Sequence, residues 1–223
     1  MHSKKQDNTV AKLPSSEQHH YLYLARGPEN TFTVNLAEAK GHSVPLYTVT
    51  HNYNMSKMEI RRLPSSPGPE QHRPIGAIKL RAIPPRVDVT LRGTAFRMVR
   101  PHALSKNLAF SFLGAPEMRW ERLPVRARGI KLVDFNGAVR GHFRPRMRLR
   151  VLEDDFGGGW GVAEEIERRQ SAGMGVGRPA RGPGFELYAS RLADLDLDLI
   201  VTTGLAAAEY RRQLQEDWDD VAE

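Results

Sequence analysis

The chain has 223 residues, a formal net charge of +7 and a pI of about 9.9, with 40 % hydrophobic residues and a mean hydropathy of −0.50. No run approaches the roughly 18 apolar residues of a membrane-spanning helix, and the polar first residues lack the apolar stretch of a secretory signal. The absence of cysteine excludes a disulfide framework, a thiolate nucleophile and a cysteine-based zinc site.

Residues 1–20 are polar and unpatterned, which predicts a disordered N-terminal arm. Residues 21–152 consist of short segments of strand-forming residues between turn residues, without the long amphipathic helices of a βαβ sheet. The predicted strands are Tyr21–Leu24, Thr31–Val34, Leu46–His51, Lys57–Arg62, Ile75–Arg81, Val87–Leu91, Ala95–Val99, Leu108–Phe112, Met118–Arg122, Ile130–Val133, Val139–Phe143 and Met147–Leu152.

The clearest hairpin joins Ile130–Val133 to Val139–Phe143 through Asn136-Gly137. Both turn residues tolerate positive φ, as a two-residue type I′ turn requires. We therefore predict a tight type I′ hairpin at this point of the chain.

Residues 154–184 interrupt the strands with a glycine-rich segment, which we interpret as a surface insertion within the domain. Its glycines have neither the spacing of a dinucleotide-binding motif nor the Gly-Lys-Ser/Thr ending of a P-loop. One further strand, Phe185–Ala189, is predicted after it.

The segment Leu199–Ala208 is apolar on nearly every side, with only Thr202 and Thr203 available for a polar stripe. Asp196 or Asp198 can cap a helix that starts here. A helix without a polar face must be enclosed on all sides, and ten residues are too few to span a bilayer. We therefore predict a mainly β domain over residues 21–214, an antiparallel closed barrel of about twelve strands around a central apolar C-terminal helix, with residues 215–223 as an acidic tail.

A meander of strands followed by a terminal apolar helix resembles the tubby C-terminal-like fold, whose superfamily includes the LURP-one-related proteins and the phospholipid scramblases. The sequence is most similar to fungal tubby-like domains of unknown function, over about residues 21–214. The signature segments of true tubby proteins and the calcium-binding acidic loop of scramblases are not evident in the sequence. The segments that carry the resemblance are Met118–Arg122, Ile130–Phe143, Phe185–Tyr188, Asp198–Leu205 and Glu209–Arg212.

Basic residues occupy every even position from 140 to 150, and alternate residues of a strand share one face. Guanidinium groups spaced in this way suit bidentate contacts to phosphate oxygens, so the stripe is the candidate anion- or lipid-binding site. The alternative is an outward strand face whose charges maintain solubility and prevent edge pairing. The candidate residues are Arg140, His142, Arg144, Arg146, Arg148 and Arg150.

No serine is surrounded by the Gly-x-Ser-x-Gly motif of a hydrolase, so we expect a binding module that is not an enzyme, without metal or cofactor. The alternating carboxylates Asp194, Asp196 and Asp198 could hold a hard cation or simply start the helix, and we favour the second interpretation. The expected partner is an anionic, phosphoinositide-bearing membrane or an acidic protein, whereas nucleic acid is disfavoured because the nearby aromatic side chains are expected to point inward, away from the arginines. We expect an intracellular, cytoplasmic protein, peripheral at the inner membrane face, or alternatively a protein-interaction or structural domain without lipid contact.

Overall fold

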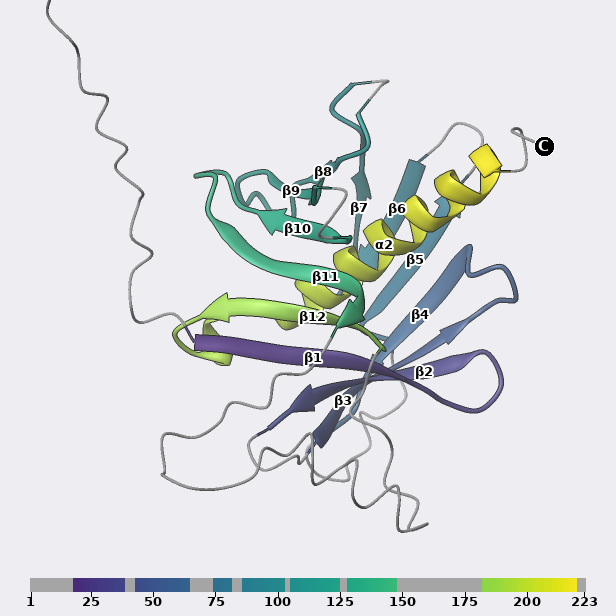
Figure 1. Ribbon diagram of the computed structural model, residues 1–223, viewed down its shortest axis with the longest axis vertical. Helices are drawn as coiled ribbons and strands as arrows, with labels where there is room; N and C mark the ends of the chain where they lie inside the picture. The colour runs from purple at the N-terminus through teal and green to yellow at the C-terminus, as the bar shows by residue number, and fades with distance from the viewer. Residues whose placement is uncertain are drawn as a thin grey trace, which may run out of the picture.

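The computed structural model describes residues 18–38, 43–64, 74–81, 86–102, 105–124, 128–147 and 182–219 (Figure 1). These residues form twelve strands and one long helix, preceded by a short 3-10 helix at Leu192–Asp194. The elements are β1 (Gln18–Arg26), β2 (Thr31–Ala37), β3 (Ser43–His51), β4 (Lys57–Arg62), β5 (Gly76–Arg81), β6 (Arg86–Leu91), β7 (Thr94–Met98), β8 (Leu108–Phe110), β9 (Met118–Arg122), β10 (Ile130–Val133), β11 (Val139–Met147), β12 (Gly182–Ala189) and α2 (Leu197–Asp219).

All twelve strands belong to one antiparallel sheet in which chain neighbours pair from β1 to β7 and from β8 to β11. The last strand, β12, lies between β1 and β11 and joins the two halves. At the opposite seam, two backbone hydrogen bonds of 2.9 and 2.8 Å between Val99 and Ala109 connect the end of β7 to β8. The sheet is therefore a nearly closed barrel, which confirms the predicted fold class.

Strand side chains alternate between the barrel interior and the outer surface, as the sequence pattern of Lys57–Arg62 indicated. In β4, Met58 and Ile60 are buried while Lys57 is exposed. In β5, Ile78 and Leu80 are buried while Lys79 faces solvent. This alternation places the apolar side chains in one continuous core inside the barrel and the charged side chains outside.

The helix α2 runs through the middle of the curled sheet (Figure 1). From Leu199 to Ala207 every residue is buried, and Ala208 is partly exposed. The two threonines available for a polar stripe, Thr202 and Thr203, are both 0 % exposed. The prediction that the strands enclose the apolar segment is confirmed.

Close contact between α2 and the barrel depends on a polar pair and a glycine. The indole Nε1 of Trp120 donates to Thr203 Oγ1 at 3.0 Å, and the Thr203 hydroxyl donates to the Leu199 carbonyl at 2.7 Å. At Gly204, an added Cβ would lie 2.4 Å from Cε1 of Phe185 and 2.9 Å from Cζ2 of Trp120. The helix backbone can therefore approach these two rings only because position 204 has no side chain.

The three aspartates around the start of α2 bind different partners. Asp196 Oδ1 accepts the Leu199 amide at 3.1 Å, so Asp196 is the N-cap. Asp198 Oδ1 accepts the Tyr47 hydroxyl at 2.8 Å, and burial together with this carboxylate raises the pKa of Tyr47. Asp194 Oδ2 accepts the backbone amide of Arg191 at 3.1 Å. These contacts support the helix-start interpretation of the acidic run.

The turn between β10 and β11 is not the predicted type I′ hairpin. Only Gly137 has positive φ (+81°), and the Gly137 amide donates to the Asp134 carbonyl at 3.0 Å across a three-residue loop. The Asp134 side chain accepts the amides of Asn136 and Ala138, both at 2.9 Å. A carboxylate that bonds its own following amides stabilises this turn, so Asn136 does not need positive φ.

Two boundaries differ from the sequence prediction at the first and last strands. β1 begins at Gln18, inside the predicted arm, because residues 18–20 pair with the distant β12. β12 begins at Gly182, within the predicted insertion. Local hydrophobicity does not reveal hydrogen bonds that a strand far along the chain supplies. Residues 1–17 and the remainder of the insertion, up to residue 181, lie outside the described residues.

Two further boundaries differ in β11 and α2. The predicted strand Val139–Phe143 continues to Met147 as β11, whose register shifts between Arg144 and Met147, and residues 148–152 of the predicted strand Met147–Leu152 lie outside the described residues. Pro145 lies within this shift and has no amide hydrogen for the ladder. The helix continues to Asp219, into the predicted acidic tail, and residues 148–150 and 220–223 lie outside the described residues.

Candidate anion-binding surface

The predicted arginine stripe lies partly on the outer face of β11. Arg140, His142 and Arg144 alternate with the buried Gly141 and Phe143, so these three basic side chains share the outward face. Arg146 belongs to the same strand, whereas the predicted site residues Arg148 and Arg150 lie outside the described residues.

Carboxylates compensate Arg140 and Arg144, the two arginines of the stripe whose side chains the structure describes. Arg140 donates from Nη2 and Nε to Asp134 Oδ2 at 2.7 and 2.8 Å. Burial would raise the pKa of Asp134, but hydrogen bonds from the Ala138 amide and from Arg140 outweigh it and lower this pKa. Arg144 Nη2 lies 3.3 Å from Glu186 Oε2 on the neighbouring strand β12. The described part of the stripe is therefore a set of structural ion pairs, with little positive charge left for a ligand.

Glu186 is the centre of a polar cluster on the outer face of β1, β11 and β12. His142 Nδ1 lies 3.7 Å from Glu186 Oε2 and also contacts the Tyr188 hydroxyl. His19 Nδ1 lies 3.2 Å from Glu186 Oε1. The contact with His142 lowers the pKa of Glu186 most, Arg144 and His19 lower it further, and together they outweigh burial to give about 2.

This cluster predicts a loss of stability in acid. Because the pKa of Glu186 is about 2 in the folded state and 4.5 for the freely exposed side chain, the unfolded chain binds the proton more readily. The contribution is fully present above about pH 5 and is lost as the pH falls toward 2, by about 3 kcal/mol. Urea unfolding across this pH range is expected to show the loss, and Glu186→Gln should flatten it. The exposed Glu117→Gln is the control, and a Glu186→Gln profile as steep as wild type would contradict the prediction.

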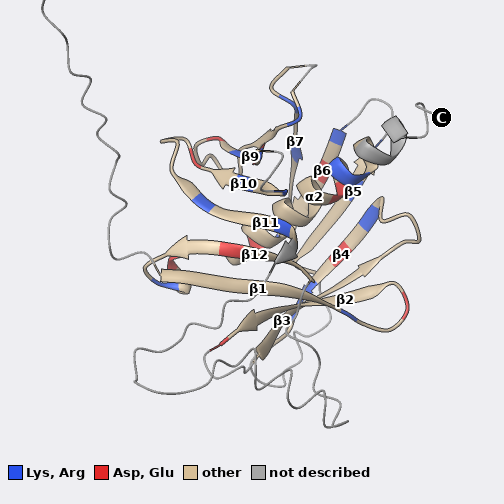
Figure 2. Ribbon diagram, viewed as in Figure 1, with Lys and Arg blue, Asp and Glu red and all other residues tan. Residues whose placement is uncertain are grey.

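A larger uncompensated charge lies on the outer surface of β4, β5, β6 and β7. We call it the basic face. Figure 2 shows Lys and Arg on all these strands, with few acidic residues between them. The register places Lys57, Lys79, Asp88 and Arg97 opposite one another, in a row across the four strands. The basic face consists of Lys57, Arg61, Lys79, Arg81, Arg86 and Arg97, with Glu59 and Asp88 as its acidic members.

One carboxylate serves three arginines at the centre of this face. Asp88 lies 2.8 Å from Arg81 Nε and 3.3 Å from the Nε atoms of both Arg86 and Arg97. The second carboxylate, Glu59, lies 2.6 Å from Arg61 Nη2 on its own strand. Six cations thus meet two carboxylates, and the guanidinium groups around Asp88 are held in place while most of their charge remains uncompensated.

Sequence reasoning missed the basic face because its members are spread over residues 57–97. The alternation in β5 indicates that Lys79 and Arg81 point outward. The alternation in β6 likewise indicates that Arg86 and Asp88 point outward. Only the pairing of β4, β5, β6 and β7 brings these residues together. The stripe at 140–150 was visible because it lies within one continuous segment.

Comparison with known proteins does not assign the chain to a family. No family model matches the chain, and no curated protein is significantly similar to it. The likeness to tubby-like domains therefore stays a prediction. Within the described residues, α2 and the 3-10 turn before it are too short or too polar to cross a bilayer as a helix.

Proposed function

We propose that this chain is a non-enzymatic binding domain that docks reversibly on an anionic phospholipid surface through its basic face. The observation that carries the proposal is the row of outward cations across β4–β7, in which three arginines share the single carboxylate of Asp88. Arginines bind phosphate oxygens bidentately, and basic residues near an anionic leaflet each contribute about 1 kcal/mol to attraction.

The topology makes the basic face and the β11 stripe alternative contacts. Between β4 and β11 the sheet contains β3, β2, β1 and β12, and between β7 and β11 it contains β8, β9 and β10. The two surfaces therefore lie on different sides of the barrel, and one flat membrane cannot contact both. We assign the contact to the basic face because Arg140 and Arg144 are already bound to Asp134 and Glu186.

Vesicle co-sedimentation with two variants of equal charge loss tests the proposal. The basic-face variant replaces Lys57, Lys79, Arg81 and Arg97 by glutamine, and the stripe variant replaces Arg144, Arg146, Arg148 and Arg150 by glutamine. We expect wild type to bind phosphatidylserine vesicles, to bind more tightly when phosphoinositide is added, and to dissociate as salt rises. The basic-face variant should bind at least about tenfold more weakly, and the stripe variant should bind like wild type.

The reverse order of the two variants would move the contact to β11, as the sequence first suggested. Binding that ignores salt and headgroup charge, or no binding to any vesicle, would overturn the membrane proposal. It would favour a protein-interaction domain instead. Circular dichroism of both variants verifies that lost binding is not lost folding.

A further inference from the structure

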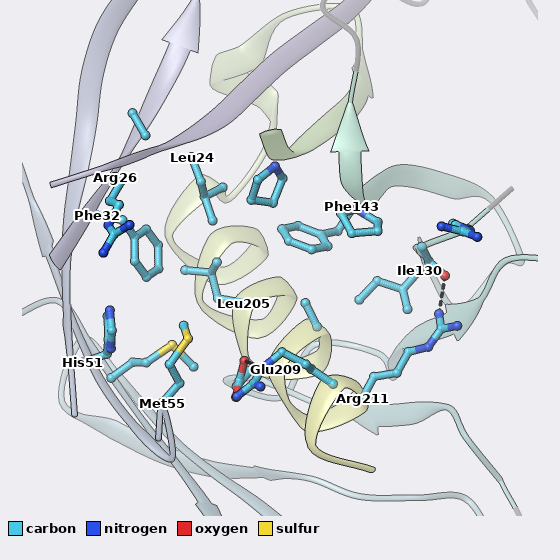
Figure 3. Close-up of a pocket in the computed structure, with 18 of the residues that line it drawn as sticks. Leu24, Arg26, Phe32, His51, Met55, Ile130, Phe143, Leu205, Glu209 and Arg211 are labelled. Atoms are coloured by element: carbon cyan, nitrogen blue, oxygen red, sulfur yellow. Dashed lines mark hydrogen bonds and ion pairs between the residues drawn. The ribbon is translucent and has the colours of Figure 1, made fainter. Parts of the chain in front are cut away.

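A cavity of about 940 Å³ lies at one end of the barrel beside the C-terminal part of α2 (Figure 3). This volume is within the range of small-molecule binding sites, about 300–1,000 Å³. The turns after β1, β3 and β9 and the ends of β11 and β12 surround it. Among the side chains that the structure describes, none of the basic face or of the stripe lines it.

The inner part of the cavity is apolar. Phe143 and Leu205, from β11 and α2, point into it, and Phe32 and Ile130 form opposite walls (Figure 3). Met55 adds a flexible thioether side chain, which adapts to ligands of irregular shape. Such a lining favours an alkyl chain over a polar ligand, because burying a polar group without a hydrogen-bond partner costs free energy.

The rim of the cavity is basic. Its lining includes five arginines and two glutamates. Glu209 is buried and already accepts hydrogen bonds from Nη2 of Arg212 at 2.6 Å and from Nε of Arg212 at 2.9 Å. Among the residues that the structure describes, no acidic side chain pairs with Arg122 or Arg211. The described residues thus leave positive charge uncompensated on the rim, beside an apolar interior.

Arg211 is held in a fixed position on this rim. Its Nη1 donates to the Gly129 carbonyl at 2.6 Å, as the dashed line in Figure 3 shows, and its other N–H groups remain available. Burial and the nearby Arg122 lower the pKa of Arg211. Two neighbouring guanidinium groups repel each other, and an anionic group between them would remove that repulsion.

We propose that this cavity binds a free single-chain amphiphile with an anionic head, of the fatty-acid class. Its alkyl chain lies against Phe143 and Leu205, and its carboxylate is bound by Arg122 and Arg211. The proposal is independent of membrane docking, because the basic face shares no residue with this cavity. Charge complementarity at the rim selects the carboxylate, and the apolar walls select the chain.

Isothermal titration calorimetry with dodecanoate below its micelle concentration tests the site. Butanoate has the same head without the chain, and dodecyltrimethylammonium has the same chain with the opposite charge. We expect saturable binding of dodecanoate alone. Arg122→Gln combined with Arg211→Gln should weaken it at least about tenfold, because the carboxylate loses its charge-assisted hydrogen bonds to both guanidinium groups.

Two steric variants test the chain site. Ala208→Phe fills the cavity from α2, and Met55→Trp fills it from the turn after β3, where Met55 is partly exposed. Either substitution should abolish dodecanoate binding in a folded protein. Met55→Trp provides the test if Ala208→Phe does not fold. The four-glutamine basic-face variant is the control and should bind dodecanoate within about twofold of wild type, which separates this proposal from membrane docking.

Three results would overturn the proposal. They are no binding of dodecanoate, equal binding of dodecyltrimethylammonium, and unchanged affinity after loss of Arg122 and Arg211. Binding to vesicles but not to dodecanoate would leave the membrane proposal intact and exclude the cavity as a fatty-acid site.

Discussion

Replacing Gly204 by alanine is expected to destabilise the protein by about 1–3 kcal/mol, although alanine favours a helix over glycine by about 1 kcal/mol. The new methyl group would lie 2.4 Å from Phe185 Cε1 and 2.9 Å from Trp120 Cζ2. Both rings are fully enclosed in the core, at 0 % and 1 % exposed, so neither can move aside freely. Chemical denaturation monitored by circular dichroism measures the difference.

The clash also predicts a compensating substitution. Phe185→Leu removes the Phe185 atoms that Gly204→Ala would contact, so the double variant should lose at least about 1 kcal/mol less than the sum of the two single losses. Gly182→Ala is the matched control, because its Cβ would lie at an ordinary 3.5 Å from the Leu24 carbonyl oxygen. An alanine at position 204 that stabilises the protein would show that the helix is not packed against these rings.

Replacing Trp120 by alanine is expected to cost about 3–5 kcal/mol, among the largest effects of any single core substitution. The indole is 1 % exposed, packs edge-on to Phe185 with ring centroids 6.4 Å apart, and donates to Thr203 Oγ1 at 3.0 Å. Its loss leaves a cavity between β9 and α2 and removes the polar contact that joins them.

Thr203→Val separates the two contributions of Trp120. This variant keeps the shape of residue 203 but leaves the buried indole N–H unpaired, and should cost about 1–3 kcal/mol. The free energy of unfolding in urea gives both values. Trp120→Ala costing no more than Thr203→Val would contradict the assignment of Trp120 as a core side chain that joins β9 to α2.

The arrangement of these contacts explains how the barrel can present charge on its outer surface. The apolar helix fills the interior, so the strands need no inward polar residues and their outward positions are free to vary. The outward side chains of β4–β7 are mostly cationic. The outward side chains of β11 and β12 form ion pairs such as Arg144–Glu186. The cavity forms beside the C-terminal part of the same helix, where α2 turns polar at Glu209.

The sequence by itself determined the strands and the enclosed helix. Alternation in Lys57–Arg62 and the lack of a polar face in Leu199–Ala208 are local properties, and they report directly on which side of an element meets the core. The alternation along β11 also predicted correctly that Arg140 and Arg144 point outward.

Only the tertiary structure decided which outward side chains meet. Strand register pairs Lys79 with Asp88 and brings Glu186 of β12 next to Arg144 of β11, over separations that no local pattern encodes. The cavity likewise arises where α2 passes turns from distant parts of the chain. Periodicity fixes the face on which a residue lies, but the neighbours of that residue depend on long-range pairing, and pairing decides whether a charge is compensated or available to a ligand.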